Sequence, residues 1–405
     1  MNRRVAVTGM GLVTPLGIGH ERFAEALFGG VSGIGPIENF DAGAFKSNCA
    51  AEVHNFSAKD FISAKLLRRM DRLSQMAAAS ARMAVEDAGV DLASADRGRM
   101  GIVMGTAFGA TDVVTRFAGT LFTEGPRRVN PILVPNTVMN APAGHTAIEL
   151  GLRGINTTLN HREASAETAI ACAAMQIREG RADMILTGGG DILSPFFFSV
   201  LKRFRALSPQ NNSEEEARPL DRQRNGPVAG EGVGVLCLEP LESARARGAT
   251  VYCEIAGWGM SGAPAPANDW PDNPDGMLRA MQAAMAMDGV HPESIDAVSA
   301  AASGGVRSDR LESLALERCF TGARHPVVTS IKGALGENFT SGGIRSAAMA
   351  IGIHTCRVPP TLGLTEPITP FAMVSTNSRE MPVGYGLVNA CASGGTFVSL
   401  LLKKS

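Results

Sequence analysis

Short apolar runs rich in β-branched residues alternate along this 405-residue chain with longer alanine-rich stretches of helical character. The apolar runs are predicted strands and span residues 4–8, 101–106, 184–188, 233–239, 252–259, 297–300, 327–331 and 398–403. The alanine-rich stretches are predicted helices and span residues 74–88, 166–179, 274–287, 310–320 and 342–354. Such alternation is typical of an α/β protein in which helices cover buried sheets.

A weak internal repeat relates the two halves of the chain. Residues 88–96 (AGVDLASAD) share a glycine–valine pair, a serine and an aspartate with residues 288–296 (DGVHPESID), each displaced by 200 positions, as from Gly89 to Gly289. A match this short leaves duplication and coincidence both open. As a duplication, it predicts two similar α/β halves, residues 1–250 and residues 251–405.

The charge balance and the cysteines narrow the classes of partner and site. Lysine and arginine number 38, aspartate and glutamate 39, and the net charge is −1, which indicates neither nucleic acid nor an anionic membrane as main partner. No apolar run reaches the roughly 18 residues of a membrane span. Seven scattered cysteines without a CxxC pair predict no metal site and no redox dithiol. Reduced thiols and the absence of a signal-peptide pattern lead us to expect a cytoplasmic protein.

Three short motifs are candidates for chemistry. The GMG motif at 9–11 follows a predicted strand but lacks the third glycine of a dinucleotide loop, so we interpret it as a glycine turn. The NHRE motif at 160–163 lies between a predicted strand and a helix, where Glu163 is either a helix-terminal charge or a presented reactive group. Lys332 is either a surface lysine or the partner of a buried carboxylate such as Glu337. These residues alone fit an enzyme and a non-enzyme equally.

Several longer motifs, taken in order, resemble one family, the β-ketoacyl-acyl-carrier-protein synthases of the elongating type. The motifs that carry the resemblance are VAVTGMGLVTPLG (5–17), VPNTVMNAPAGHTAIELGLRG (134–154), ADMILTGGGD (182–191), FRALSP (204–209), RPLDRQRNGPVAGEGVGVLCLEPLESARARGA (218–249) and VNACASGGT (388–396). The resemblance covers essentially the whole chain. It implies a thiolase-like α/β fold, a duplicated arrangement of αβαβα layers.

The family's catalytic residues are carried over one at a time. Its nucleophilic cysteine sits in a turn before a long helix, and the matching turn LNHREASAE has Glu163 at the cysteine position. Its first catalytic histidine falls on Ala301, within SAAASGG. Its characteristic lysine is retained as Lys332, and the second histidine, five residues later, is replaced by Glu337. The resemblance therefore implies that the catalytic set is not intact and that only Lys332 survives from it.

These replacements have separate chemical consequences. Without the thiol, the chain cannot be acylated as a thioester. Without both histidines, no side chain donates hydrogen bonds to a thioester carbonyl while a malonyl group loses CO2. A Glu163 carboxylate would also repel an incoming malonyl carboxylate. The two phenylalanines of the family's closing loop, one of them a gate, are matched by Cys391 and Ser393. The resemblance thus implies a pocket that is disabled for condensation.

Ketosynthase-like chains without the catalytic residues resemble chain-length factors, the β subunits of type II polyketide synthases. We therefore expect a heterodimer in which this chain shapes the acyl or polyketide tunnel of an active ketosynthase, as a subunit of an acyltransferase complex without condensing activity alone. The resemblance implies no cofactor of its own, because the partner acts on acyl chains carried by the phosphopantetheine of an acyl carrier protein. It also makes Phe108, Thr111 and Leu133 candidate tunnel-lining residues, with ordinary packing as the alternative.

Other interpretations stay open. One is a divergent acyl-thioester decarboxylase or hydrolase that uses Glu163 and Glu337 as an acid/base pair. Another is an inactive homodimer that serves as a scaffold. We expect Lys332 to form an ion pair with Glu163, Glu337 or both, as a polar lock that keeps acyl chains out. The product is left open between an aromatic polyketide, an aryl polyene and another polyene, because glutamate at position 163 departs from the glutamine typical of many aromatic-polyketide factors.

Overall fold

The computed structural model describes residues 3–43, 45–210 and 214–405. Within them, eleven strands form one large mixed sheet: β1 (Val5–Thr14), β2 (Gly17–Ile18), β5 (Met100–Gly105), β6 (Asn156–Leu159), β7 (Met184–Asp191), β9 (Gly232–Pro240), β10 (Cys253–Gly262), β11 (Ala297–Ser299), β12 (Val327–Thr329), β15 (Tyr385–Ala392) and β16 (Thr396–Lys403). The short strands outside it are β3 (Ile34–Pro36), β4 (Cys49–Ala51), β8 (Ala229–Gly230), β13 (Arg357–Val358) and β14 (Arg379–Glu380).

Helices cover this sheet, and each predicted helix is present with small shifts at its ends. The α-helices are α1 (His20–Phe28), α2 (Ala64–Leu67), α3 (Arg72–Asp87), α4 (Thr111–Glu124), α5 (Ala141–Leu150), α6 (Ser165–Arg178), α7 (Pro195–Arg203), α8 (Leu241–Ala246), α9 (Asp275–Ala286), α10 (Val306–Cys319), α11 (Lys332–Leu335) and α12 (Gly342–Thr355). The 3-10 turns are η1 (Ala58–Asp60), η2 (Arg97–Arg99), η3 (Pro131–Asn136), η4 (Arg162–Ala164) and η5 (Pro292–Ser294).

The large sheet consists of two arrays with the same strand order. The order is β6-β5-β7-β9-β1 in one array and β12-β11-β15-β16-β10 in the other, and β1 pairs with β10 where the arrays meet. The parallel pairs of β5 with β6 and β7 correspond to those of β11 with β12 and β15. Gly89 and Gly289, the glycines of the weak sequence repeat, both have a φ of 64° just after α3 and α9. The repeat therefore marks equivalent positions of a duplicated unit.

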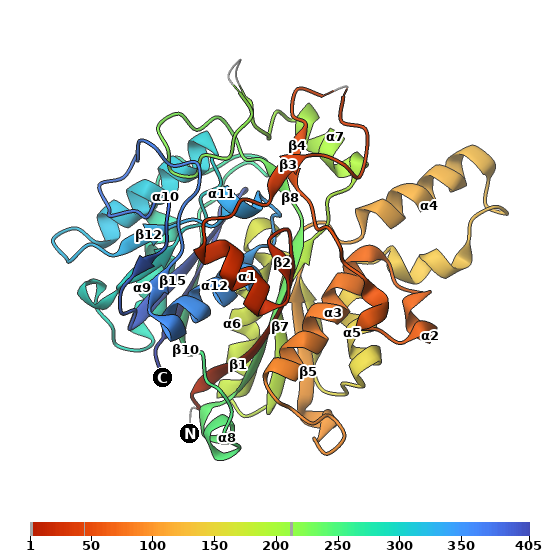
Figure 1. Cartoon of the computed structure of the whole chain (residues 1–405), viewed down its shortest axis with the longest axis horizontal. Coiled ribbons are helices and arrows are strands. Elements are labelled where there is room, and N and C mark those ends of the chain that lie inside the picture. The colour runs from red at the N-terminus through yellow and green to blue at the C-terminus, as the bar shows by residue number, and fades with distance from the viewer. Residues whose placement is uncertain (1–2, 44, 211–213) are drawn as a thin grey trace.

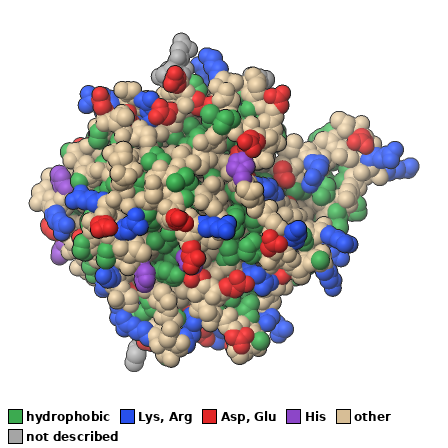
Figure 2. Space-filling model, in the orientation of Figure 1, with side chains coloured by type: hydrophobic (Ala, Val, Ile, Leu, Met, Phe, Trp, Pro, Cys, Tyr) green, Lys and Arg blue, Asp and Glu red, His purple; other side chains and the backbone are tan. Residues whose placement is uncertain are grey.

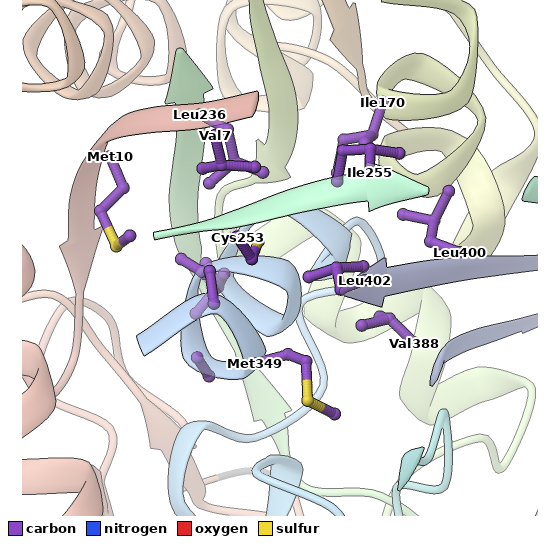
Figure 3. Packing of buried hydrophobic residues seen from close by; sticks show 14 of the residues in the cluster. Val7, Met10, Ile170, Leu236, Cys253, Ile255, Met349, Val388, Leu400 and Leu402 are labelled. Carbon is purple, nitrogen blue, oxygen red and sulfur yellow. The ribbon is translucent and has the colours of Figure 1, made fainter. Parts of the chain in front are cut away.

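The helices and strands form five layers. The two central helices, α6 and α12, each contact strands of both arrays and lie between them (Figure 1). The outer face of the first array is covered by α3 and α5, and that of the second by α9 and α10. Figure 3 shows part of the buried apolar cluster around the central layer, which includes Ile170 of α6, Met349 of α12 and strand residues such as Leu400. The predicted α/β class with duplicated αβαβα layers is confirmed.

The glycine turn predicted at residues 9–11 is wrong. Strand β1 continues without a turn from Val5 to Thr14 and pairs with β9 along this length, with one irregularity between Val7 and Gly9. A β-carbon on Gly9 would lie 2.2 Å from the carbonyl oxygen of Ala84, and one on Gly11 would lie 1.9 Å from that of Ser80. The glycines are needed because α3 packs directly on the strand, and not because the chain turns there.

A long excursion between β5 and β6 stands away from the layers as an arm, defined here as residues 111–139 (Figure 1). Helix α4 buries only Val113 among its described side chains, and η3 buries only Asn136. Figure 2 shows acidic and basic side chains interspersed over the body, and the arm carries three arginines, Arg116, Arg127 and Arg128, and no lysine. In the described residues, no helix is both long and apolar enough to cross a membrane.

Candidate functional site

A cavity of about 600 Å³ brings the predicted site residues together. Glu163 lies in η4, Ala301 follows β11, Lys332 is the first residue of α11, and Glu337 lies two residues after that helix ends. All four line the cavity, together with Cys391, near the end of β15, and Ser393, which follows that strand. The aromatic part of its wall consists of Phe108, Phe197, Phe204, Trp270 and Phe339.

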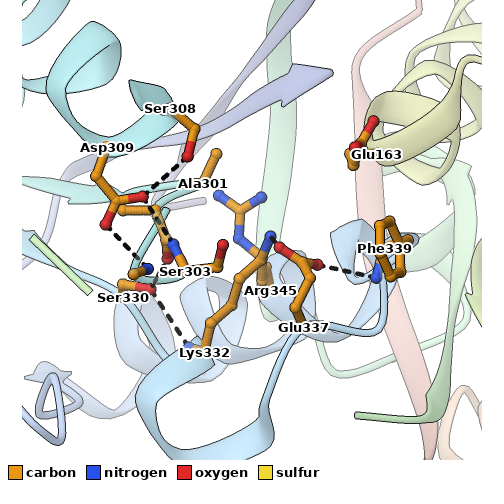
Figure 4. A network of polar contacts seen from close by, with 12 residues as sticks. Glu163, Ala301, Ser303, Ser308, Asp309, Ser330, Lys332, Glu337, Phe339 and Arg345 are labelled. Carbon is orange, nitrogen blue, oxygen red and sulfur yellow. Dashed lines mark hydrogen bonds and ion pairs between the residues drawn. The ribbon is translucent and has the colours of Figure 1, made fainter. Parts of the chain in front are cut away.

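Lys332 and Glu337 form a buried ion pair on the floor of the cavity (Figure 4). Lys332 Nζ lies 2.6 Å from Glu337 Oε2, and their side chains are 4% and 8% exposed. Gly336, at a φ of 65°, ends α11 and turns the chain so that Glu337 lies beside Lys332. Glu337 Oε1 also accepts the backbone N–H of Phe339, at 2.9 Å. The expected ion pair between Lys332 and Glu337 is thus present, and each oxygen of the Glu337 carboxylate has a partner.

Glu163 has a different partner. Its Oε1 accepts the hydroxyl of Ser393 at 3.0 Å, and its Oε2 accepts the backbone N–H of Ser393 at 3.2 Å. Among the described residues Glu163 makes no ion pair with Lys332, and its nearest cation is Arg162, whose Nε lies 3.9 Å away. Burial and the Glu337 carboxylate raise the pKa of Glu163 above its usual range. The expected pair with Lys332 therefore involves Glu337 and not Glu163.

Two carboxylates that the sequence pattern did not single out hold the loop at Ala301. The backbone N–H groups of Ala301 and Ala302 donate to Glu312 at 3.0 and 2.9 Å. Asp309, one turn earlier on α10, accepts the N–H groups of the next two residues at 3.1 and 3.0 Å (Figure 4). Burial raises the pKa of Glu312 to about 7. The only sequence signal was two acidic residues three apart on a helix that also presents apolar residues to the core.

Cys391 is the one thiol among the described residues that line the cavity. The sequence comparison identified it only as a replacement for an aromatic residue. Burial, followed by the charges of Glu312 and Glu163, raises the pKa of Cys391 well above its usual range. Because the thiolate and not the thiol is the nucleophile, a raised pKa lowers the nucleophilicity of this cysteine at neutral pH. No histidine is found in the same described lining.

The three candidate tunnel residues occupy different places. The Phe108 ring lies in the cavity wall, with its centroid 4.1 Å from that of Phe197 and 5.0 Å from that of Phe339. Thr111 begins α4, at the base of the arm, and its hydroxyl lies 3.0 Å from that of Ser194. Leu133 is half-buried in η3, farther along the arm. Phe108 therefore faces this chain's own cavity, whereas the other two belong to the arm.

The backbone around the cavity is unusual. Arg162, Arg205 and Phe339 line it and have φ values of 53°, 52° and 59°. Residues with a side chain rarely adopt this left-handed region, and surrounding contacts must hold them there. Such residues cluster at functional sites. The cavity thus has the backbone conformations that are common at functional sites.

Comparisons with known proteins agree with the layered architecture. The family model for the N-terminal domain of β-ketoacyl synthases matches residues 2–244, and that for the C-terminal domain matches residues 252–365. A 3-oxoacyl-[acyl-carrier-protein] synthase 2 of Staphylococcus aureus (strain COL) is 33% identical over 416 residues, covering 100% of this chain and 99% of that protein.

Two solved structures are similar over their whole length. The ishigamide ketosynthase/chain length factor has a TM-score of 0.94 and 31% identity, with 100% of both chains covered. A β-ketoacyl synthase from Burkholderia phymatum STM815 has a TM-score of 0.91 and 28% identity, again with 100% of both chains covered. These matches confirm the thiolase-like ketosynthase fold expected from the motifs. Sequence, architecture and site together establish that the chain belongs to the β-ketoacyl synthase family.

Proposed function

We propose that this chain is a non-catalytic subunit of the chain-length-factor type. It forms a heterodimer with an active ketosynthase and shapes the tunnel into which that partner extends an acyl or polyketide chain. The observation that carries the proposal is the content of the cavity, where Glu163, Ala301 and Glu337 stand at the positions matched to the family's cysteine and histidines. A condensing enzyme needs a nucleophile and hydrogen-bond donors at these three positions, and Glu163, Ala301 and Glu337 supply no thiol and no imidazole there.

The polar groups that remain are engaged with one another. Lys332 neutralises Glu337, and Glu163 is hydrogen-bonded to Ser393. Two carboxylates that act as an acid/base pair must reach a substrate or water between them. Because each has its own protein partner, the decarboxylase or hydrolase interpretation gains no support from the geometry.

The relatives suggest the partners. A similar structure with 31% identity carries the name ketosynthase/chain length factor, which supports an active ketosynthase as the companion subunit. The sequence relative is named for acyl carrier protein, which supports a carrier protein as the source of phosphopantetheine-bound acyl chains. In this proposal the chain needs no cofactor of its own and works in the cytoplasm.

The arm is the surface proposed to meet the ketosynthase. Its exposed large apolar side chains are Val114, Phe122, Ile132, Val134 and Val138, of which Phe122 is 84% exposed. Exposed apolar patches mark interaction sites in proteins, and these five side chains all belong to the projecting arm. Thr111 and Leu133 lie on the same arm and are proposed to line the partner's tunnel, whereas Phe108 lines this chain's own cavity.

Two measurements test the proposal. This chain, carrying an affinity tag, is co-expressed with a ketosynthase from the same organism that retains its cysteine and histidines, and the purified material is analysed by size-exclusion chromatography with light scattering. We expect a one-to-one heterodimer. The isolated chain is then incubated with radiolabelled malonyl-acyl carrier protein. Release of labelled CO2 or formation of a longer acyl product by the isolated chain would refute the non-catalytic role, and a stable homodimer that ignores the ketosynthase would refute the partnership.

A further inference from the structure

Three segments far apart in the sequence meet beside the cavity. They are the η4 turn, the loop 391–395, which comprises the last two residues of β15 and the turn before β16, and a Pro/Asn/Asp-rich segment, APAPANDWPDNP, at residues 263–274. Residues of all three line the cavity. The third segment has no role in the proposed tunnel function. This segment nevertheless makes hydrogen bonds to the η4 turn, to the loop 391–395 and to α10.

Arg162 ties the η4 turn to the segment 263–274. Its Nη1 donates to the carbonyl oxygen of Ala267, and its Nη2 lies 3.3 Å from Asn268 Oδ1. The backbone of Arg162 has a φ of 53°. That conformation, which a non-glycine residue rarely adopts, is held by the contacts around it.

Glu163, the next residue, ties the same turn to the other loop. Its carboxylate accepts both the hydroxyl and the backbone N–H of Ser393, at 3.0 and 3.2 Å. The residues in contact are 230 positions apart. Two consecutive side chains of one short turn therefore reach two different loops of the second half of the chain.

The two loops are also joined to each other and to α10. Gly394 donates its N–H to the carbonyl oxygen of Asp269 at 2.9 Å, and Ala263 donates its N–H to that of Gly395 at 2.8 Å. A β-carbon on Gly395 would lie only 1.6 Å from the Ala263 oxygen, so the loops are in direct backbone contact. On the outer side, Arg307 of α10 bonds to Asp269, to Asp272 and to the carbonyl oxygen of Trp270.

We propose that Arg162 and Glu163 form a clasp that fixes the loop 391–395 and the segment 263–274 over the cavity and thereby excludes acyl-pantetheine ligands. The cavity, at about 600 Å³, lies within the volume range of ordinary ligand sites, so access and not size is what the clasp limits. The inference rests on the proposed function, because it assumes that the cavity performs no condensation. In such a cavity, Glu163 holds a loop in place at the position that matches the family's cysteine.

Amide hydrogen exchange of the full-length chain tests the clasp. In the double variant Arg162→Ala/Glu163→Ala, we expect the amides of segments 263–274 and 391–395 to exchange about tenfold faster or more, because two charge-assisted contacts are lost. The single variant Glu163→Gln keeps Arg162 and retains a side-chain oxygen that accepts a hydrogen bond from Ser393. We therefore expect its amides in the loop 391–395 to exchange as slowly as those of the unmodified chain. The matched control is Arg318→Ala, which removes an exposed arginine paired with Asp275 on the outside of α10.

A binding measurement completes the test. Dodecanoyl-pantetheine is titrated calorimetrically into each variant, and we expect saturable binding to the double variant, at least about tenfold tighter than any binding to the unmodified chain or the control. Unchanged exchange in both segments, exchange that rises evenly over the whole chain, or equal probe binding by all variants would overturn the clasp. Condensing activity of the unmodified chain would instead refute the proposed function, and the exchange pattern would still decide about the clasp.

Discussion

Replacing Lys332 with methionine tests how the cavity floor is held together. Lys332 and Glu337 are 2.6 Å apart and almost fully buried. The substitution keeps the length of the aliphatic side chain but leaves the Glu337 carboxylate without its cation, and Glu163 is close enough to add to the repulsion. Removing one partner of a buried pair typically costs about 3–5 kcal/mol.

That cost converts into a measurable shift of the melting temperature. At about 2.1 cal/mol/K per residue, unfolding 405 residues has an entropy of about 0.85 kcal/mol/K. A loss of 3–5 kcal/mol then lowers Tm by about 4–6 °C. Differential scanning calorimetry at neutral pH measures this shift directly.

Lys403→Met is the matched control. Lys403 Nζ lies 3.0 Å from Asp288, but these side chains are 31% and 27% exposed. A pair open to solvent contributes about 0–1 kcal/mol, so Tm is expected to fall by about 1 °C or less. In the double variant Lys332→Met/Glu337→Met no charge is left unpaired, and Tm is expected to return to within about 2 °C of the unmodified value. Equal shifts for Lys332→Met and Lys403→Met, or a double variant less stable than Lys332→Met, would refute the reasoning.

Three further predictions concern other groups. Burial raises the pKa of Glu312 to about 7 in the folded chain, above its value of about 4.5 in the unfolded chain. The protonated side chain therefore contributes stability that is fully present below about pH 4.5 and is lost as the pH rises through 7. The loss of folding free energy is about 3 kcal/mol. Glu312→Gln removes this part of the pH dependence, and the difference in Tm between pH 5 and pH 8 is expected to be smaller than in the unmodified chain; an identical difference would contradict the assignment. Cys391 is expected to resist iodoacetamide at pH 7.5 until the chain is unfolded, as read by peptide mass spectrometry, and rapid labelling of the native chain would show a reactive thiol. Thr111→Trp in the heterodimer is expected to shorten the product by at least one extension unit. The larger side chain would occupy tunnel space in which methylenes of the growing chain are buried, each worth about 0.8 kcal/mol. An unchanged product mass in mass spectrometry would place Thr111 outside the tunnel wall.

Local sequence pattern accounts for most of the architecture. The predicted strands and helices were recognisable because apolar periodicity is a property of short segments. The predicted 9–11 turn failed for the same reason. In the sequence, two glycines that form a turn cannot be told apart from two glycines that leave room for a helix to pack on a strand. The structure distinguishes the two cases, because α3 packs directly against Gly9 and Gly11. Strand β15, which carries glycine, asparagine and cysteine among its apolar residues, was not predicted at all.

The sequence by itself determined the α/β class and, through motifs that resemble one family, predicted the duplicated organisation and the positions that match that family's catalytic residues. Only the tertiary structure decided how the replacement residues are paired: Glu337 with Lys332 across a single turn, and Glu163 with Ser393 across 230 residues. The physical reason is range. Periodicity and motifs are properties of residues that are close together in the sequence. An ion pair or hydrogen bond depends instead on distances of a few ångströms, which folding creates between segments that are remote in the chain.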